Sequence, residues 1–208
     1  MIQKSVDQTR ILTRNEIAQV ITDLRKRGRR SINQRQNLII FRLATCCGLR
    51  VSEIVGLSMA NVVVGSARPH IYIPKEIAKR NKARKVPLWW DQATLTELDQ
   101  WKKERTGQGA KAGSSFVCSQ SVGSMGKQLE IRNAQYRFKV AIKCLGTDRV
   151  QMLSIHSGRH SFCSHSLAGG RSIAEVRDAA GHANISTTSI YLHAIHEDGD
   201  EVGNLFEF

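Results

Sequence analysis

Three short β-like runs, "NVVVG", "HIYIP" and "RKVPL", lie close together between Asn61 and Leu88. Short runs of β-branched and aromatic residues bounded by Gly, Pro or Asn are typical of strands, and a basic segment, "KEIAKRNKAR", leads from the second run into the third. Elsewhere the apolar residues recur mainly at the three- and four-residue spacing of helices. The sequence therefore predicts a mainly α-helical domain of the α+β class, with one small three-stranded antiparallel sheet and a charged hairpin.

The helical part of the chain carries two capping boxes, at Thr13-x-x-Glu16 and at Ser172-x-x-Glu175. In this arrangement each side chain can satisfy the free backbone N–H of the other residue, which marks a helix N-terminus. A glycine after a helical pattern indicates a helix C-terminus, so Gly48 is expected to end the apolar segment "NLIIFRLATCC". Further helices are predicted over about 34–47, 91–105, 128–145, 156–168 and 172–180, followed by a short helix that carries Tyr191.

A chain of 208 residues is long enough for one domain with a substantial core. We expect residues 1–11 to form an arm or the remnant of a linker, 12–194 to form the folded domain, and 195–208 to form a tail. The tail is acidic but carries four apolar residues, so it is expected to dock on its own domain or on a neighbouring protomer. No apolar run is long enough for a membrane helix, and the first residues lack a secretory signal, so we expect a cytoplasmic protein or one on the host nucleoid.

The charge balance indicates the class of partner. The chain has 31 Lys and Arg against 18 Asp and Glu, a net charge of +13, and nucleic acid is the commonest partner of so basic a domain. Contacts to the DNA backbone are expected from two basic clusters, at Arg25, Lys26, Arg27, Lys82 and Arg84. The five cysteines show no CxxC pair, so reduced, buried thiols are favoured over a zinc site or a disulfide framework.

Several side chains suited to phosphate chemistry stand at the ends of predicted elements. Arg50 follows the glycine that ends a helix, and His156 and Arg159 are three residues apart, on one face of a helix start. His182 directly follows a glycine, and Tyr191 lies nine residues further on. Lys79 lies in the turn of the charged hairpin. Each alone is an ordinary core or surface residue, but together they form a candidate site.

Four ordered segments resemble the motifs of the tyrosine recombinases, the phage integrase family. They are "CCGLRVSEIVGL", "AKRNKARKVPL", "HSGRHSF" and "AGHANISTTSIYLHA". The spacings, 23 residues from Arg159 to His182 and nine from His182 to Tyr191, fit the family pattern. The resemblance runs from about Leu12 to Ala194, which makes 12–194 a catalytic domain. It implies a tyrosine-type site-specific recombinase that cuts and rejoins double-stranded DNA through a 3′-phosphotyrosine intermediate, within a tetrameric assembly of protomers.

The resemblance assigns a role to each residue of the site. Tyr191 would be the nucleophile, and Arg50 and Arg159 would clamp the phosphate, because bidentate donors neutralise the charge that attack builds on its nonbridging oxygens. His156 and His182 would manage protons and donate hydrogen bonds at the phosphate. An ordinary tyrosine has a pKa near 10, so its oxygen needs these groups to become nucleophilic.

Two further assignments concern the leaving group and the support of the site. Lys79 would be the general acid that protonates the departing 5′ oxygen, and Lys82 lies close enough in the same turn to compete for that role. Glu53, three residues after Arg50, would buttress the site. The phosphotyrosine ester conserves the bond energy, so the resemblance implies no metal, nucleotide or other cofactor, no small-molecule substrate and no membrane partner.

Two departures from the family pattern stand out. Family members usually carry Leu in the third place of the H-x-x-R box, where this chain has Gly158, and we expect its absence to loosen the helix start. They also usually carry an N-terminal DNA-gripping domain, whereas about eleven residues precede the catalytic part here. The chain would be a catalytic fragment, or a short member such as the fimbrial inversion recombinases.

Other functions remain open from the sequence. A type IB topoisomerase uses the same ester but religates the same strand, and an inactive DNA-binding relative would keep only the basic surface. A metal-dependent nuclease would need clustered carboxylates, whereas the 18 acidic residues are scattered. The DNA site and the direction of the reaction are left undetermined.

Overall fold

The computed structural model describes residues 7–192. Its α-helices are α1 (Arg14–Gly28), α2 (Ile32–Thr45), α3 (Val51–Gly56), α4 (Gln92–Gly107), α5 (Ile131–Ala141), α6 (Thr147–Met152), α7 (Ile155–Ala168), α8 (Ile173–Ala180) and α9 (Ser186–Ser189). Its 3₁₀ turns are η1 (Gln8–Arg10), η2 (Met59–Asn61), η3 (Lys79–Asn81) and η4 (Ile142–Leu145). The strands are β1 (Val62–Val63), β2 (His70–Ile73) and β3 (Arg84–Pro87). The expected docking of the tail 195–208 lies outside the described residues.

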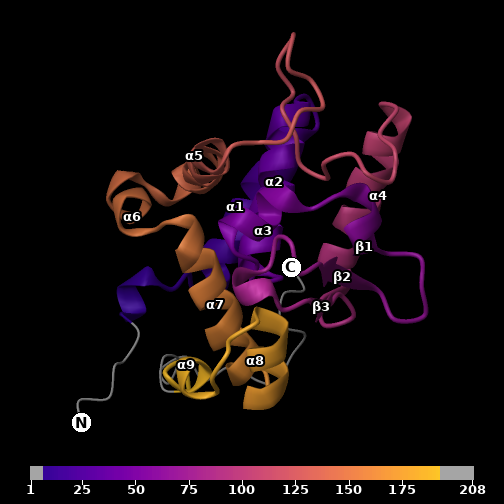
Figure 1. Ribbon diagram of the computed structural model, residues 1–208. Helices are drawn as coiled ribbons and strands as arrows, with labels where there is room; N and C mark the ends of the chain where they lie inside the picture. The colour runs from indigo at the N-terminus through magenta and orange to yellow at the C-terminus, as the bar shows by residue number, and fades with distance from the viewer. Residues whose placement is uncertain (1–6, 193–208) are drawn as a thin grey trace.

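The three strands form one antiparallel sheet in the order β1-β2-β3. Val62 pairs with Ile71, and Ile71 pairs with Val86 on its other side. All three side chains are buried, so this row of the sheet faces the core. The sheet and α4 lie on one side of the helical body, and α5 and α6 lie on the opposite side (Figure 1). The predicted α+β class and the small antiparallel sheet are therefore confirmed.

Both capping boxes are present as predicted. Thr13 and Glu16 exchange side chain to backbone hydrogen bonds at the start of α1, and Ser172 and Glu175 do the same at the start of α8. Gly48 follows α2 with a φ of 65°, a left-handed conformation that glycine adopts without steric cost. The capping boxes thus placed the starts of α1 and α8, whereas α2 spans Ile32–Thr45 and ends two residues before the expected end at Cys47.

Helix α2 is the centre of the fold, with every residue from Gln36 to Thr45 buried. It contacts α1, α4, α5 and α7, and Phe41 stacks on Phe138 of α5 with 5.7 Å between ring centroids. Its one fully buried charge, Arg42, is paired with Glu97 and with Asp91. A buried charge requires such partners, because an unpaired one would be strongly destabilising.

Helix α7 packs against α2 at very short range at Gly158. A Cβ atom at this position would lie 2.7 Å from Oγ1 of Thr45 and 3.0 Å from Cβ of Ala44. The expectation that Gly158 loosens the helix start is therefore wrong, since α2 occupies the space that a side chain would fill. Glycine lets the two helices approach, and α7 carries the H-x-x-R box.

Two local predictions also need correction. The helix expected over 128–145 is α5 followed by the 3₁₀ turn η4, and the separate short helix α6 was missed. Tyr191 was expected within a short helix, but α9 ends at Ser189 and Tyr191 lies in the turn that follows. None of the helices within residues 7–192 is long and apolar enough to cross a membrane.

Candidate active site

Arg50 stands at the N-terminus of α3, where the backbone enters the helix directly after Leu49 and Gly48. A Cβ atom on Gly48 would lie 2.3 Å from the ring of Phe162, so glycine is required both by this contact and by the positive φ. The guanidinium of Arg50 donates to Oε1 of Glu53 and to the carbonyl oxygen of Gly181, each at 3.0 Å. Arg50 thus links α3 to the end of α8.

Glu53 is fully buried and binds two arginines. Arg84 donates from both terminal nitrogens to its two carboxylate oxygens at 2.8 Å, and the Arg50 backbone N–H donates to Oε2, also at 2.8 Å. Burial acts to raise the pKa of Glu53, but the hydrogen bonds and charge of Arg84 and Arg50 outweigh burial and hold it below its ordinary value. The supporting role expected of Glu53 therefore has a geometric basis.

Arg84 does not lie as expected. We predicted a DNA contact, but its side chain is turned inward, and its Nε donates to the carbonyl oxygen of Ala179 at 2.9 Å. All three of its nitrogens are occupied inside the protein, so it ties β3 to α3 and α8. Of the other predicted DNA contacts, Lys26 and Lys82 have exposed side chains. Arg25 forms an ion pair with Glu97, and Arg27 forms one with Asp23.

Arg159 is buried on α7 and joins three segments. It donates to the carbonyl oxygen of Gly48 at 2.5 Å and to that of Ala180. Burial, with a smaller contribution from the nearby charge of Arg50, lowers its pKa to about 10. The side chain therefore stays positive near neutral pH, next to Arg50, as two charges that a phosphate could neutralise.

His182 follows Gly181, which ends α8 in the left-handed conformation at φ 67°. Its Nδ1 lies 2.9 Å from Oγ1 of Thr188, which is completely buried. Burial, and then the charges of Arg159 and Arg50, lower the pKa of His182 to about 3. The ring is therefore neutral near pH 7, with its Nε2 side available as a donor when Thr188 donates to Nδ1.

Tyr191 lies against two histidines. Its hydroxyl is 2.7 Å from Nδ1 of His160, and its ring is parallel to that of His182, with 6.3 Å between centroids and 7° between planes. The residue is only 5% exposed, and burial raises the pKa of the hydroxyl above its ordinary value. His160 and Thr188 were both missed in the sequence, although each lies inside a quoted motif.

His156 and Lys79 lie at the open side of the site, and both side chains are exposed. Burial, and then the charges of Arg159, Arg50 and Lys79, lower the pKa of His156, which places the hairpin lysine within electrostatic range of α7. Lys79 precedes Arg80 and Asn81, whose φ values are 68° and 55°. Two successive left-handed residues make the lysine turn sharp and conformationally costly.

The structure thus brings these five predicted residues together from three separate parts of the chain. Arg50 comes from α3, His156 and Arg159 from α7, and His182 and Tyr191 from the segment after α8, with hydrogen bonds between these parts. Arg50 and Arg159 meet near the end of α8, where Arg50 donates to the carbonyl oxygen of Gly181 and Arg159 to that of Ala180. Within residues 7–192, no group of three or more His, Cys, Asp or Glu side chains could hold a metal ion.

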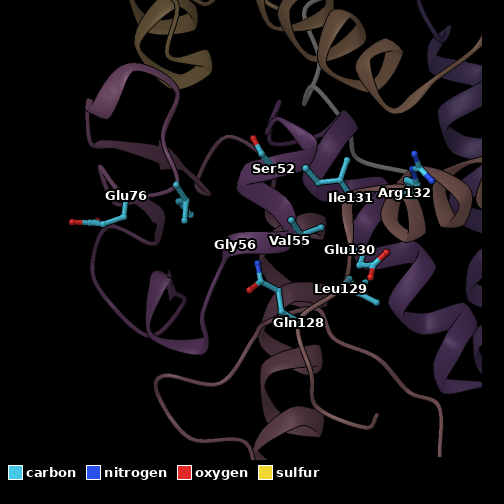
Figure 2. Close-up of a pocket in the computed structure, with 10 residues that line it drawn as sticks. Ser52, Val55, Gly56, Glu76, Gln128, Leu129, Glu130, Ile131 and Arg132 are labelled. Carbon is cyan, nitrogen blue, oxygen red and sulfur yellow. The ribbon is translucent and has the colours of Figure 1, made fainter.

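A hollow of about 570 Å³ lies between α3, the hairpin and the start of α5 (Figure 2). Its wall is formed by Ser52, Val55 and Gly56, by Glu76 and Ile77 of the hairpin, and by residues 128–132 at the start of α5. None of the predicted catalytic residues lines it. The candidate active site is instead the charged cluster between α3, α7 and the Tyr191 segment.

A sequence model described as the phage integrase family matches residues 10–197. The chain belongs to the phage integrase family. The expectation drawn from the four motifs is therefore confirmed for the family as a whole.

Individual members of the phage integrase family are similar to this chain over part of their length. The tyrosine recombinase XerC of Stutzerimonas stutzeri is 32% identical over 160 residues, which cover 76% of this chain and 48% of the relative. The XerC of Azotobacter vinelandii is 33% identical over 162 residues, with the same two shares. The chain thus spans about half the length of the curated relatives that it matches.

Solved structures show that the integrase-family fold extends over almost all of the chain. A crystal structure of XerA recombinase aligns with a TM-score of 0.72 at 17% identity, covering 95% of this chain and 61% of that one. A XerH recombinase bound to palindromic difH substrate, in a post-cleavage complex, aligns with a TM-score of 0.66 at 22% identity, covering 88% and 49%. At these identities the likeness establishes the fold alone.

Proposed function

We propose that this chain is the catalytic part of a site-specific DNA recombinase, which cuts and rejoins strands through a phosphotyrosine intermediate. The observation that carries the proposal is the convergence of Arg50, Arg159, His182 and Tyr191 on one cluster. Family membership adds support, as do the named relatives, which are tyrosine recombinases. The net charge of +13 favours double-stranded DNA as the substrate.

Binding of the scissile phosphate would use the two arginines. Each is held by backbone carbonyl oxygens, at Gly181 for Arg50 and at Gly48 and Ala180 for Arg159. Groups that are already oriented stabilise developing charge without reorganisation during the reaction. The neutral His182 would add a hydrogen bond from Nε2, since its Nδ1 is engaged by Thr188.

Strand cleavage would then follow as an in-line displacement. The Tyr191 oxygen forms a bond to phosphorus, the bond from phosphorus to the 5′ oxygen breaks, and the product is a 3′-phosphotyrosine ester with a free 5′ hydroxyl. Lys79 would protonate that 5′ oxygen, and Lys82 is the alternative in the same turn. His156, exposed beside Arg159, would contribute a further donor to the phosphate.

Attack requires a change in the Tyr191 segment. The residue is almost fully buried and its hydroxyl has a raised pKa, so the surrounding segment would have to open for the phosphate to reach the phenol oxygen. The raised pKa by itself disfavours attack. The arginines and a proton acceptor would have to compensate for it in the complex with DNA.

Several finer features belong to the same proposal. We infer that 12–194 is the catalytic domain, that residues 1–11 form an arm or the remnant of a linker, and that 195–208 dock in cis or in trans. Recombination would require further protomers on DNA, in a tetrameric synapse. An enzyme acting on host DNA would work in the cytoplasm.

Covalent capture tests the function without knowledge of the DNA site. The protein is incubated in EDTA, without nucleotide, with a pool of nicked duplexes of randomised sequence, whose short cleaved ends diffuse away. SDS-stable protein–DNA adducts are then isolated and their DNA is sequenced. Adducts enriched for one sequence support a site-specific recombinase, dispersed adducts support a topoisomerase, and DNA binding without any adduct would indicate an inactive relative.

A further inference from the structure

His160 contacts the reacting atom of the proposed nucleophile. Its Nδ1 lies 2.7 Å from the hydroxyl oxygen of Tyr191, and the two rings are tilted by 37° with centroids 5.7 Å apart. A phenol has one proton to donate, and an unprotonated imidazole nitrogen is its natural acceptor. With Nδ1 as the acceptor, the proton of the neutral His160 ring resides on Nε2.

The other histidine beside Tyr191 has a different relationship to it. The His182 ring lies parallel to the phenol ring, and its Nδ1 is engaged by Thr188. His156 lies one helical turn before His160 on α7 and is exposed. Of these three histidines, His160 is therefore the one whose ring nitrogen is directed at the phenol oxygen.

We propose that His160 is a catalytic residue, the base that takes the proton of Tyr191 as the phenol oxygen attacks the phosphate. This inference rests on the proposed function. The O–H bond of Tyr191 breaks and its proton passes to Nδ1 of His160 while the bond from oxygen to phosphorus forms. In the religation step, the same proton returns to the phenol oxygen as the ester bond breaks.

The surroundings of His160 favour its unprotonated form. Burial, and then the charges of His156, Arg159 and Arg10, lower its pKa below the ordinary value of 6.5. His156 and Arg159 lie on the same helix, Arg10 lies in η1, and Tyr191 faces the ring from the segment after α9. At neutral pH the ring is thus an acceptor, and the proton it receives arrives as negative charge builds on the phosphate.

The test replaces His160 by asparagine, whose side-chain oxygen can accept a hydrogen bond at about the position of Nδ1 but cannot take the proton. The rate of covalent adduct formation is measured on a nicked duplex recovered from the capture experiment. His160→Asn should form the adduct about 100-fold more slowly at pH 7.5, the lower end for general-base catalysis, with unchanged DNA affinity. His70→Asn, in strand β2, is the matched control and should keep the wild-type rate.

The pH profile separates proton transfer from mere positioning. In the wild type the rate should fall as the pH decreases through the pKa of His160, below 6.5, because the protonated ring cannot accept. In His160→Asn this acid limb should be lost. A wild-type profile with no acid limb at any pH at which the protein stays folded, as judged by circular dichroism, would contradict the proposal, whether or not the variant folds.

A sulfur-substituted substrate distinguishes the base from the general acid. When the bridging 5′ oxygen is replaced by sulfur, the leaving group needs no proton, so Lys79→Ala should recover most of its rate, whereas His160→Asn should remain slow. Equal rates for wild type and His160→Asn on normal DNA would overturn the inference but leave the proposed function intact. Absence of any adduct from the wild type would instead refute the proposed function.

Discussion

Oγ1 of Thr188 lies 2.9 Å from Nδ1 of His182, and Thr188 is completely buried. The exposed residues 183–187 lie between Thr188 and His182, and this segment folds back through the start of α9 to place a hydroxyl against the imidazole. A hydrogen bond on one ring nitrogen fixes the tautomer and orientation of the other. We therefore propose that Thr188 positions the donor that His182 would present to the phosphate.

Replacing Thr188 by valine should keep the volume of the side chain but leave His182 without this partner. The loss of one buried hydrogen bond, about 1 kcal/mol, should slow adduct formation by about fivefold to tenfold. Single-turnover cleavage of a captured nicked duplex measures the effect. Thr187→Val, at an exposed position of the same helix α9, serves as the control, and equal rates for both variants would exclude a positioning role.

The close contact at Gly158 makes a prediction about stability. Gly158→Ala places a Cβ against Thr45 and Ala44 of α2, and overpacking of this kind costs about 1–3 kcal/mol. Urea denaturation should show this loss in the free energy of unfolding. Gly113→Ala, in a loop where nothing lies within 4 Å of the added atom, should leave stability almost unchanged. An unaffected Gly158→Ala would mean that α7 and α2 separate easily.

The buried Glu53 predicts a dependence of stability on pH. Its pKa is depressed in the folded protein, so its contribution is present above the unfolded-state value of about 4.5 and is lost as the pH falls through the lower folded-state pKa. Glu53→Gln should be less stable than wild type by about 3 kcal/mol or more at pH 7, because Arg84 is left unpaired. The difference in the free energy of unfolding between wild type and Glu53→Gln should become smaller below pH 4.5.

The control for this prediction is Glu76→Gln, which removes the same charge at an exposed position of the hairpin. It should leave the free energy of unfolding within about 0.5 kcal/mol of the wild-type value. If the free energies of unfolding of wild type and Glu53→Gln differed by the same amount from pH 7 to pH 3, the ionised Glu53 carboxylate would contribute nothing to the stability of the fold.

The hairpin lysines should differ in their effect on the leaving group. Lys79→Ala should slow cleavage of normal DNA by about 100-fold or more, and far less on a substrate with a bridging 5′ sulfur. Lys82→Ala should weaken DNA binding mildly and keep the rate. Sulfur rescue of Lys82→Ala instead of Lys79→Ala would transfer the acid role to Lys82.

Local sequence signals predicted much of the architecture, and their physical basis explains where they failed. The capping boxes at Thr13 and Ser172 and the left-handed Gly48 depend on neighbouring residues alone, so they could be identified directly. The environment of Gly158 depends on α2, more than 110 residues earlier in the sequence. A local sequence pattern cannot show a contact with so remote a helix. The inward turn of Arg84 is similar, because its partner Glu53 is buried and lies 31 residues earlier in the sequence.

The candidate site shows the same division. The motifs predicted a set of residues that the structure brings together, but His160 was read as part of the H-x-x-R box and given no role. Its contact with Tyr191 depends on where the hydroxyl lies, which only the packing of the last turn on α7 determines. Burial of Tyr191 was equally hidden, since "NISTTS" before it is polar.

The most direct test of the account is covalent capture with the three tyrosine variants. Wild-type protein, Tyr72→Phe and Tyr136→Phe should accumulate an SDS-stable adduct on the nicked duplex in EDTA, because both other tyrosines are exposed and neither contacts the site. Tyr191→Phe should bind the same DNA with unchanged affinity and form no adduct. An adduct that persists in Tyr191→Phe would contradict the assignment of the nucleophile.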